Sequence, residues 1–146
     1  MSMCTVFDVA AYILKKTGMI THLKLQKLVY YSQAWSLIWD EKPLFSEKIE
    51  AWANGPVIPK LYEKLRQKYG VNKSILGCGN PDKLSKKRQK TVDAIIDYYG
   101  KRDSQYLSDL THMEDPWKNA RAGLAPGERG NREITLAAMA DYYSSL

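Results

Sequence analysis

The sequence predicts a mainly α fold: a single compact domain over residues 1–146, with about six helices around a central buried helix. Three observations support this class. Apolar residues recur at helical spacing along most of the chain, the stretch Thr21–Trp39 is apolar on two sides, and the helical period changes to an extended pattern at residues 44–58. A length of 146 residues suits one domain, and no internal repeat divides the chain.

A first short helix is predicted from Thr5 to Gly18. Thr5 followed three residues later by Asp8 has the spacing of a capping box. The apolar residues from Val6 to Leu14 then repeat at helical spacing. Glycine at the end suits the left-handed conformation that closes many helices.

The next stretch predicts the central helix, with Thr21 as its N-cap and Pro43 beyond its end. At about 100° per residue, two broad faces are apolar. These faces contain Leu25, Leu28, Val29, Trp35 and Trp39 on one side and Leu23, Tyr30, Ala34 and Leu37 on the other. Two polar seams separate them, with Lys24, Lys27 and Tyr31 in one and Gln26 and Gln33 in the other. A helix with two apolar faces is packed on both, so we expect it in the middle of the domain.

Residues 44–58 predict a short extended or hairpin insert. Their apolar residues show no helical stripe, and the Asn-Gly-Pro sequence at residues 54–56 is a strong turn signal. Pro59 suits the first turn of the following helix, because its missing N–H costs nothing there. We expect that helix to continue to Tyr69 and to end at Gly70.

The second half of the chain predicts a loop at residues 71–84 and then further helices. Their expected boundaries are Ser85 to Gly100, Asp103 or Ser104 to His112, Asp115 to Arg121, and Ile134 to Tyr143. A polar, glycine-rich loop at residues 123–131 precedes the last helix.

Composition excludes several classes of protein. No apolar run approaches the roughly 20 residues of a membrane span, and the first residues lack the pattern of a secretory signal. We therefore expect a cytoplasmic protein without membrane contact. Cys4 and Cys78 lie far apart and belong to no metal-binding pattern, so we expect neither a metal site nor a cofactor.

The stretch THMEDPW at residues 111–117 invites a chemical interpretation. The imidazole of His112 and the carboxylates of Glu114 and Asp115 could share a proton or a cation. The structural interpretation is a sharp corner between helices. His22 is the only other histidine, and no nucleophile or phosphate-loop motif occurs. We expect no catalytic residue and no enzyme, with a hydrolase or transferase centred on His112 as the alternative.

A basic run is the most concentrated charge in a chain of net charge +6. It consists of Lys83, Lys86, Lys87, Arg88 and Lys90. Such a patch neutralises phosphates in nucleic-acid-binding proteins, and it also suits an acidic protein partner. The simpler interpretation is a solvated loop and first helical turn.

The aromatic content is high, with four tryptophans and ten tyrosines. We expect the tryptophans to anchor the core. Tyrosine tolerates water at its hydroxyl and suits protein interfaces. Adjacent pairs occur at Tyr30–Tyr31, Tyr98–Tyr99 and Tyr142–Tyr143. One member of each pair should point away from the core, which predicts a protein-binding patch on these helices.

Three motifs follow one another along the chain: LKLQKLVYYSQAW at 23–35, PLFSEKIEAWANGPVIPKLY at 43–62 and LSDLTHMEDPWKNAR at 107–121. Together they resemble the Panacea domain, the family of SocA-like and GepA-like phage-associated proteins. The residues that carry the resemblance include Lys27, Tyr30, Tyr31, Trp35, Glu50, Trp52, Gly55, Pro56, Pro59, Tyr62, Thr111, His112, Pro116 and Trp117. Asn54 departs from the pattern, since many members have an aromatic residue there.

The resemblance implies an antitoxin that holds the toxin of a neighbouring gene inactive by direct protein contact. It also implies two modes of action, a chaperone-like one and that of a proteolytic adaptor, which delivers the toxin to a ClpXP-type protease. A nucleic-acid-binding regulator that uses the basic patch at residues 83–90 is the alternative from another class.

Overall fold

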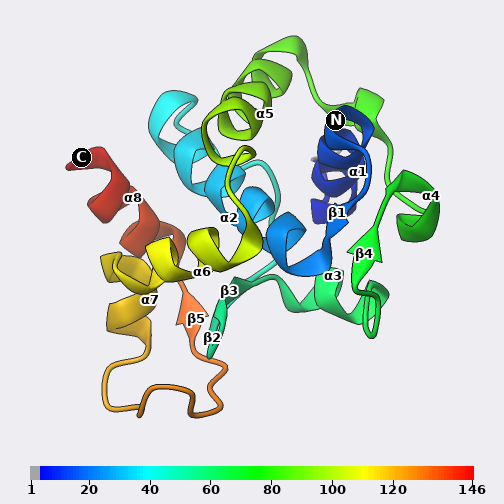
Figure 1. The fold of residues 1–146 in the computed structure, drawn as a ribbon. Helices are drawn as coiled ribbons and strands as arrows, with labels where there is room; N and C mark the ends of the chain where they lie inside the picture. Colours follow the sequence, from blue (N-terminus) through cyan, green and yellow to red (C-terminus); the bar gives the residue numbers. More distant parts are fainter. Residues whose placement is uncertain (1–3) are drawn as a thin grey trace.

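The computed structural model describes residues 4–146, so the first three residues of the predicted domain lie outside the described part. The prediction of a mainly α fold is confirmed, with small antiparallel sheets added to the helices (Figure 1). The helices are α1 (Val6–Thr17), α2 (His22–Trp39), α3 (Pro59–Lys64), α4 (Lys73–Leu76), α5 (Lys86–Tyr99), α6 (Ser104–His112), α7 (Asp115–Ala120) and α8 (Leu136–Ser144), with a 3-10 turn at Pro81–Lys83. The strands are β1 (Ile20–Thr21), β2 (Ile49–Trp52), β3 (Gly55–Val57), β4 (Gly70–Val71) and β5 (Glu133–Ile134).

The described residues form eight α-helices, more than the six or so that the sequence predicts. One unexpected helix is α4, a single turn inside the predicted loop. Asn72 caps it by accepting a hydrogen bond from the Ile75 N–H at 2.8 Å. Gly77 ends it in the left-handed conformation, with φ of 68°. A helix of four residues is too short to show an apolar period, so no pattern could reveal it.

Most of the predicted helix starts are confirmed. The capping side chains, each accepting a backbone N–H of the first turn, are Thr5, Thr21, Ser85 and Asp103. Thr5 and Asp8 form the complete capping box, since the Thr5 N–H donates to Asp8 Oδ2 at 2.9 Å. Asp115, which the sequence predicts as the N-cap of α7, is instead its first helical residue, and the N-cap is Glu114.

Helix α3 is shorter than the sequence predicts. It ends at Lys64 instead of continuing to Tyr69, and the chain turns at Gln67, which has a φ of 66°. The next residues form β4, which pairs antiparallel with β1 through Ile20 and Val71. Strands of two residues show no alternation of side chains, so no pattern in the sequence predicts this pairing.

The predicted insert at residues 44–58 contains a β-hairpin. Strands β2 and β3 are joined by a two-residue turn at 53–54, with Trp52 opposite Gly55. The C-terminal strand β5 pairs with the other edge of β2. The insert therefore gains a third strand from a segment far along the chain.

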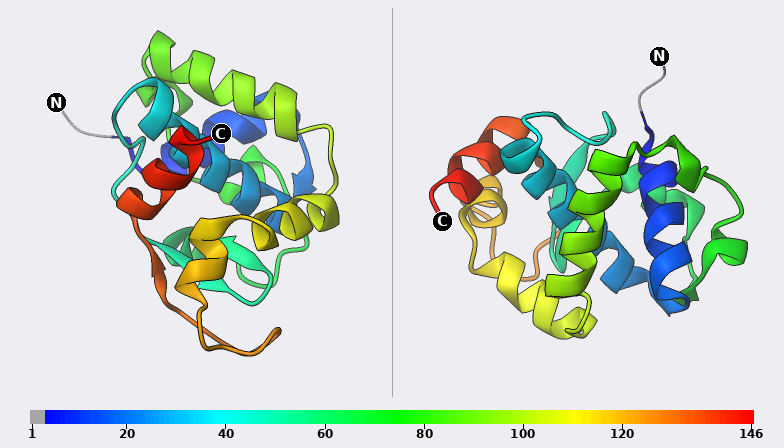
Figure 2. Two further views of the ribbon diagram at one scale, coloured as in Figure 1. Left: turned by 90° about the vertical axis from the view of Figure 1, so that its left-hand side faces the viewer. Right: turned by 90° about the horizontal axis from the view of Figure 1, so that it is seen from above.

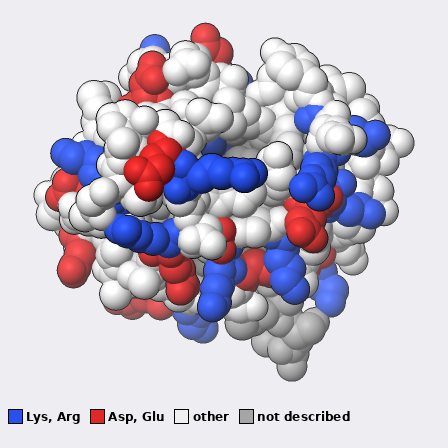
Figure 3. Space-filling model, turned by 90° about the horizontal axis from the view of Figure 1, so that it is seen from below, with Lys and Arg blue, Asp and Glu red and all other residues white. Residues whose placement is uncertain are grey.

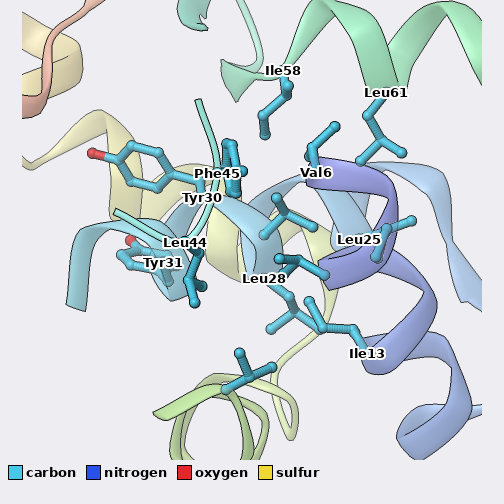
Figure 4. Close-up of a cluster of buried hydrophobic side chains, with 14 of the residues drawn as sticks. Val6, Ile13, Leu25, Leu28, Tyr30, Tyr31, Leu44, Phe45, Ile58 and Leu61 are labelled. Carbon is cyan, nitrogen blue, oxygen red and sulfur yellow. The ribbon is translucent and has the colours of Figure 1, made fainter. Parts of the chain in front are cut away.

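Helix α2 contacts α1, α5, α6, α8 and β3. Figures 1 and 2 show α7 and α8 at one end of the molecule and α1 and α4 at the other, with α2 between them. Aliphatic side chains of α1 and α2 pack in the core with Phe45, Ile58 and Leu61 (Figure 4). Within residues 4–146, none of the helices combines the length and apolar character needed to cross a membrane.

The burial of α2 differs from the predicted faces and seams. Gln26, Lys27, Tyr31 and Gln33 were expected on polar seams, but each is at most 1% exposed. Trp39 was expected on an apolar face, but it is 49% exposed. Polar side chains are buried in proteins where they find hydrogen-bond partners, and the partners here come from other segments.

The two glutamines of α2 bind the backbone at both ends of the insert. Gln33 Oε1 accepts from the Leu44 N–H at 2.7 Å, and its Nε2 donates to the Phe45 carbonyl at 2.8 Å. Gln26 Oε1 accepts from the Ile58 N–H at 2.9 Å. Within the described chain, the backbone groups at the two ends of the insert have no hydrogen bonds to a neighbouring strand, and the glutamines supply bonds in their place. These bonds fix the hairpin against α2.

We expect Gln33→Met to lower the free energy of unfolding by about 1 to 3 kcal/mol, because it leaves buried backbone groups of Leu44 and Phe45 without partners. Methionine has a similar length, so no large cavity results. The measurement is urea denaturation followed by circular dichroism. Gln105→Met, at an exposed position of α6, is the matched control and should change stability by less than about 0.5 kcal/mol. Equal losses in the two variants would contradict this role of Gln33.

Candidate functional site

Three segments that are distant in sequence meet at the hairpin: α2, strand β3 and the end of α6. The side chain of Lys27 lies where they meet, and its Nζ donates to the Pro56 carbonyl at 3.3 Å. Gly55 packs directly on it, with φ of 121°. A Cβ at Gly55 would lie 2.7 Å from Lys27 Cε and 3.0 Å from Thr111 Oγ1, so only glycine fits there. The structure thus brings residues of all three sequence motifs into direct contact.

Lys27 is a buried amine with one hydrogen-bond acceptor. The Pro56 carbonyl is the only partner that residues 4–146 provide for its Nζ. Burial lowers the pKa of Lys27 to about 7, because the ammonium loses its hydration without gaining a carboxylate. The side chain therefore titrates near neutral pH.

Glu114 is the acceptor of a buried tyrosine cluster. The hydroxyls of Tyr31 and Tyr143 each donate to Glu114 Oε1 at 2.7 Å. The Tyr30 and Tyr143 hydroxyls are 3.1 Å apart, and since Tyr143 already donates to Glu114, Tyr30 is the donor of this pair. Burial raises the pKa of Glu114, and the two tyrosine hydrogen bonds lower it in part. Figure 4 shows the hydroxyl ends of Tyr30 and Tyr31 directed away from the aliphatic cluster.

The region of α7 is bonded to the hairpin through two long side chains. Trp117 Nε1 donates to the Trp52 carbonyl at 2.8 Å. Arg121 Nη1 donates to the Ala51 carbonyl at 3.0 Å, and its Nη2 reaches two carbonyls of the loop that follows α7. Arginine supplies five donors in a rigid fork, which suits it to this buried position. Strand β2 is therefore held by α7 as well as by its neighbouring strands.

His112 stacks on Trp117, with ring centroids 3.9 Å apart and planes 13° from parallel. Its Nε2 is buried without a hydrogen-bond partner among residues 4–146, and burial lowers its pKa. The carboxylate of Glu114 binds tyrosines instead, and no hydrogen bond in the described chain joins His112 to Glu114 or Asp115. The three side chains considered as an acid–base cluster are thus not bonded to one another.

The motif residues lie inside the molecule or at its edge. Lys27, Tyr30, Tyr31, Gly55, Pro56, Thr111 and Pro116 are buried. Trp35, Glu50, Trp52, Pro59, Tyr62, His112 and Trp117 are half-buried. Their hydrogen bonds and ring contacts are made with other parts of the chain, so the motifs mainly build a framework that holds the hairpin.

The predicted basic patch divides into two parts. Four of its side chains are exposed around the start of α5: Lys83, Lys86, Lys87 and Lys90. Arg88 is half-buried instead, and its Nη1 donates to the Pro43 and Leu44 carbonyls at 3.2 and 3.3 Å. Arg88 therefore helps to hold the segment before the hairpin.

The exposure of the three tyrosine pairs is as predicted for one pair and different for another, and in the third Tyr142 is half-buried beside the buried Tyr143. Tyr98 is 74% exposed while Tyr99 is buried, as expected. The expectation is wrong for Tyr30 and Tyr31, which are both buried because Glu114 and Tyr143 satisfy their hydroxyl network. Tyr98 lies edge-on to Tyr99, so the aromatic surface of α5 continues into the core.

An open groove of about 770 Å³ lies beside the hairpin. Its lining comes from the first turns of α2, the hairpin, α3, the segment before β4 and the loop before β5, and most of its surface is apolar. Figure 3 shows the face that carries α3 and this loop, where blue and red side chains are interspersed around a hollow with white walls. The groove could not be predicted from the sequence, because segments far apart in the chain form it and no single segment has a motif for it.

The fold and the buried contacts define a small helical protein built on a framework of three motifs. The family model described as antitoxin SocA-like, Panacea domain matches residues 25–118. The match covers more than half of the chain, so this protein belongs to the SocA-like Panacea domain family, and the resemblance carried by the motifs is confirmed. Comparisons with curated proteins and with solved structures give no match.

The stability of the protein should depend on the protonation of Lys27. Its folded-state pKa of about 7 lies below the ordinary value of 10.5, so the unfolded chain binds more protons between these values. Stability contributed by this group should therefore rise with pH from about 7 to about 10, by at most roughly 1.4 kcal/mol per pH unit.

The measurement compares the free energy of unfolding of the wild type and of Lys27→Met across this pH range. The difference between the two proteins should change with pH, because all other titrating groups are shared. Lys118→Met, at an exposed position of α7, serves as the control and should follow the wild type. A constant difference between wild type and Lys27→Met would show that Lys27 keeps its ordinary pKa.

Proposed function

We propose that this protein is an antitoxin that neutralises the toxin of a neighbouring gene by direct protein contact. The observation that carries the proposal is its membership of the SocA-like Panacea family, an antitoxin family. Membership supports a toxin as the partner in general. The proposal adds that the toxin is encoded by a neighbouring gene and that the two proteins are in direct contact. It also adds that residues 1–146 act as one domain in the cytoplasm.

The burial of the motif residues supports separate roles for the framework and for the exposed surface. The contacts of Lys27, Gly55 and Trp117 are internal, so the family signature serves the framework. Contacts with the toxin would then be made by exposed surfaces that this framework positions. The proposal includes no catalytic step, and it assigns His112 a structural role, in line with its stacking on Trp117.

Neutralisation has two candidate modes, masking of the toxin in a stable complex and delivery of the toxin to a ClpXP-type protease. The modes differ in the fate of the toxin. Under masking, the toxin persists beside the antitoxin, while an adaptor shortens its lifetime. Pulse-chase of the toxin in protease-positive and protease-deficient cells separates them.

The first expectation is genetic. Expression of the neighbouring gene alone should arrest growth, and co-expression of this protein should restore it. The unfolding-prone Gln33→Met variant should rescue less well at raised temperature, because less folded antitoxin is present. A neighbouring gene that does not arrest growth, or that arrests it despite this protein, would contradict the proposal.

The second candidate function is a nucleic-acid-binding regulator. The observation that favours it is the group of exposed lysines at the start of α5. Their charges oppose the positive end of the helix dipole, a small cost of a few tenths of a kcal/mol each that a bound phosphate would remove.

If this second function holds, the logarithm of the affinity for duplex DNA should fall linearly with the logarithm of salt concentration. Replacing Lys86, Lys87 and Lys90 with glutamine should lower the slope by roughly 0.9 for each phosphate that the variant no longer neutralises. The control replaces Lys15, Lys16 and Lys118, which are exposed elsewhere. Fluorescence anisotropy with a labelled duplex measures the affinity of each protein at each salt concentration. Undetectable or salt-independent binding would contradict this second function.

A further inference from the structure

The groove beside the hairpin has a rigid aromatic wall. Trp52 and Tyr62 meet edge to face with ring centroids 4.8 Å apart, and His22 stacks on Tyr62 at 5.4 Å. The backbone of Trp52 is bonded to Trp117, and its indole N–H donates to Glu50. A wall held in this way keeps its shape when the groove is empty, which lowers the entropic cost of binding.

The charged side chains that line the groove have one sign. Lys68 and Arg129 are the charged side chains of its lining, and no aspartate or glutamate lines it. Both are exposed, and neither is paired with a carboxylate in the described part of the chain. The groove therefore attracts an anionic group and offers no carboxylate to a cationic one.

His22, which also lines the groove, is neutral and has a defined tautomer. Gln26 Oε1 accepts from the Ile58 N–H, so the amide is oriented with its Nε2 towards His22 Nε2, 3.0 Å away. The amide nitrogen can only donate, so His22 Nε2 is the acceptor and the ring proton lies on Nδ1. Burial lowers the pKa of His22 to about 4, which keeps this neutral form at physiological pH. No acceptor among residues 4–146 bonds Nδ1.

The wall and the charges select one kind of occupant. An apolar side chain fits against Trp52 and Tyr62, and a neighbouring carboxylate fits near Lys68 or Arg129. The volume of about 770 Å³ lies in the range of pockets that enclose a few side chains. A nucleic acid fits poorly, because most of the lining is apolar and it has only two cations.

We propose that this groove is the toxin-docking site and that it binds a toxin segment with a large apolar side chain next to a carboxylate. The inference rests on the proposed antitoxin function and specifies the surface and the chemistry of the partner. Lys68 lies between the second and third motifs, and Arg129 lies after the third. Substitutions at these two positions can therefore change the charge of the groove without changing the framework.

The test uses the full chain co-expressed with the product of the neighbouring gene, after growth rescue has been shown. Tyr69, a rim residue that is 84% exposed, is replaced by the photo-cross-linker p-benzoylphenylalanine. The matched control places the same cross-linker at Tyr98, which is 74% exposed on α5 and does not line the groove. Mass spectrometry then identifies the linked peptide.

We expect a toxin cross-link from the Tyr69 position at least tenfold stronger than from the Tyr98 position. The linked toxin segment should contain aspartate or glutamate beside an aromatic or large aliphatic residue. Cross-links mainly from the Tyr98 position would assign docking to the aromatic surface of α5 and overturn the proposal. A linked toxin segment without a carboxylate would overturn the proposed chemistry of the partner segment.

A second measurement tests the charges. The double variant Lys68→Glu, Arg129→Glu should weaken toxin binding at least tenfold by biolayer interferometry. The control Lys73→Glu, Lys118→Glu makes the same change in net charge at exposed positions outside the groove and should stay within about threefold of wild type. Equal weakening in both would show a general charge effect and overturn the proposal. Absence of rescue by the unsubstituted protein would instead overturn the antitoxin function itself.

Discussion

The structure depends on one constraint, the need of the two buried glutamines of α2 for hydrogen-bond partners. A polar group that is buried without a partner costs about 1 to 3 kcal/mol, and a charged group costs more. Gln26 and Gln33 meet this need with the backbone of Ile58, Leu44 and Phe45. Burial of these two glutamines therefore favours the observed position of the insert. The hairpin is therefore placed by α2 as well as by its own turn.

The same constraint explains how the three motifs act together. Two hairpin carbonyls that α2 does not use, those of Trp52 and Ala51, accept hydrogen bonds from Trp117 and Arg121. Gly55 allows Lys27 and Thr111 to approach the hairpin from two directions at once. A change in any one of these segments would leave polar groups of the other two without partners. Part of the groove wall, including Gln26, Trp52 and Tyr62, belongs to this framework.

Arg121 and Lys27 are buried basic residues, and they differ in how their charged groups are satisfied. Arg121 spreads its charge over three carbonyls of the hairpin and the following loop. Lys27 has a single carbonyl, so burial shifts its pKa towards neutrality. An amine can lose its proton at moderate cost, while a guanidinium cannot, which is why the position with fewer acceptors suits lysine. The surface cations Lys68 and Arg129 have no such constraint and are available to a partner.

The sequence by itself determined the helical class, four helix caps, the place of the hairpin and the family. These features depend on short-range patterns, such as Thr5 with Asp8 or the motif around Gly55, whose physical effect is local. Only the tertiary structure decided that Tyr30 and Tyr31 are both buried, that Trp39 is exposed, and that β1 pairs with β4. It also decided that Trp52, Tyr62, Lys68 and Arg129 border one groove. The reason is that burial and pairing of these residues depend on partners distant in the chain, such as Glu114 for Tyr31, which no local pattern of residues contains.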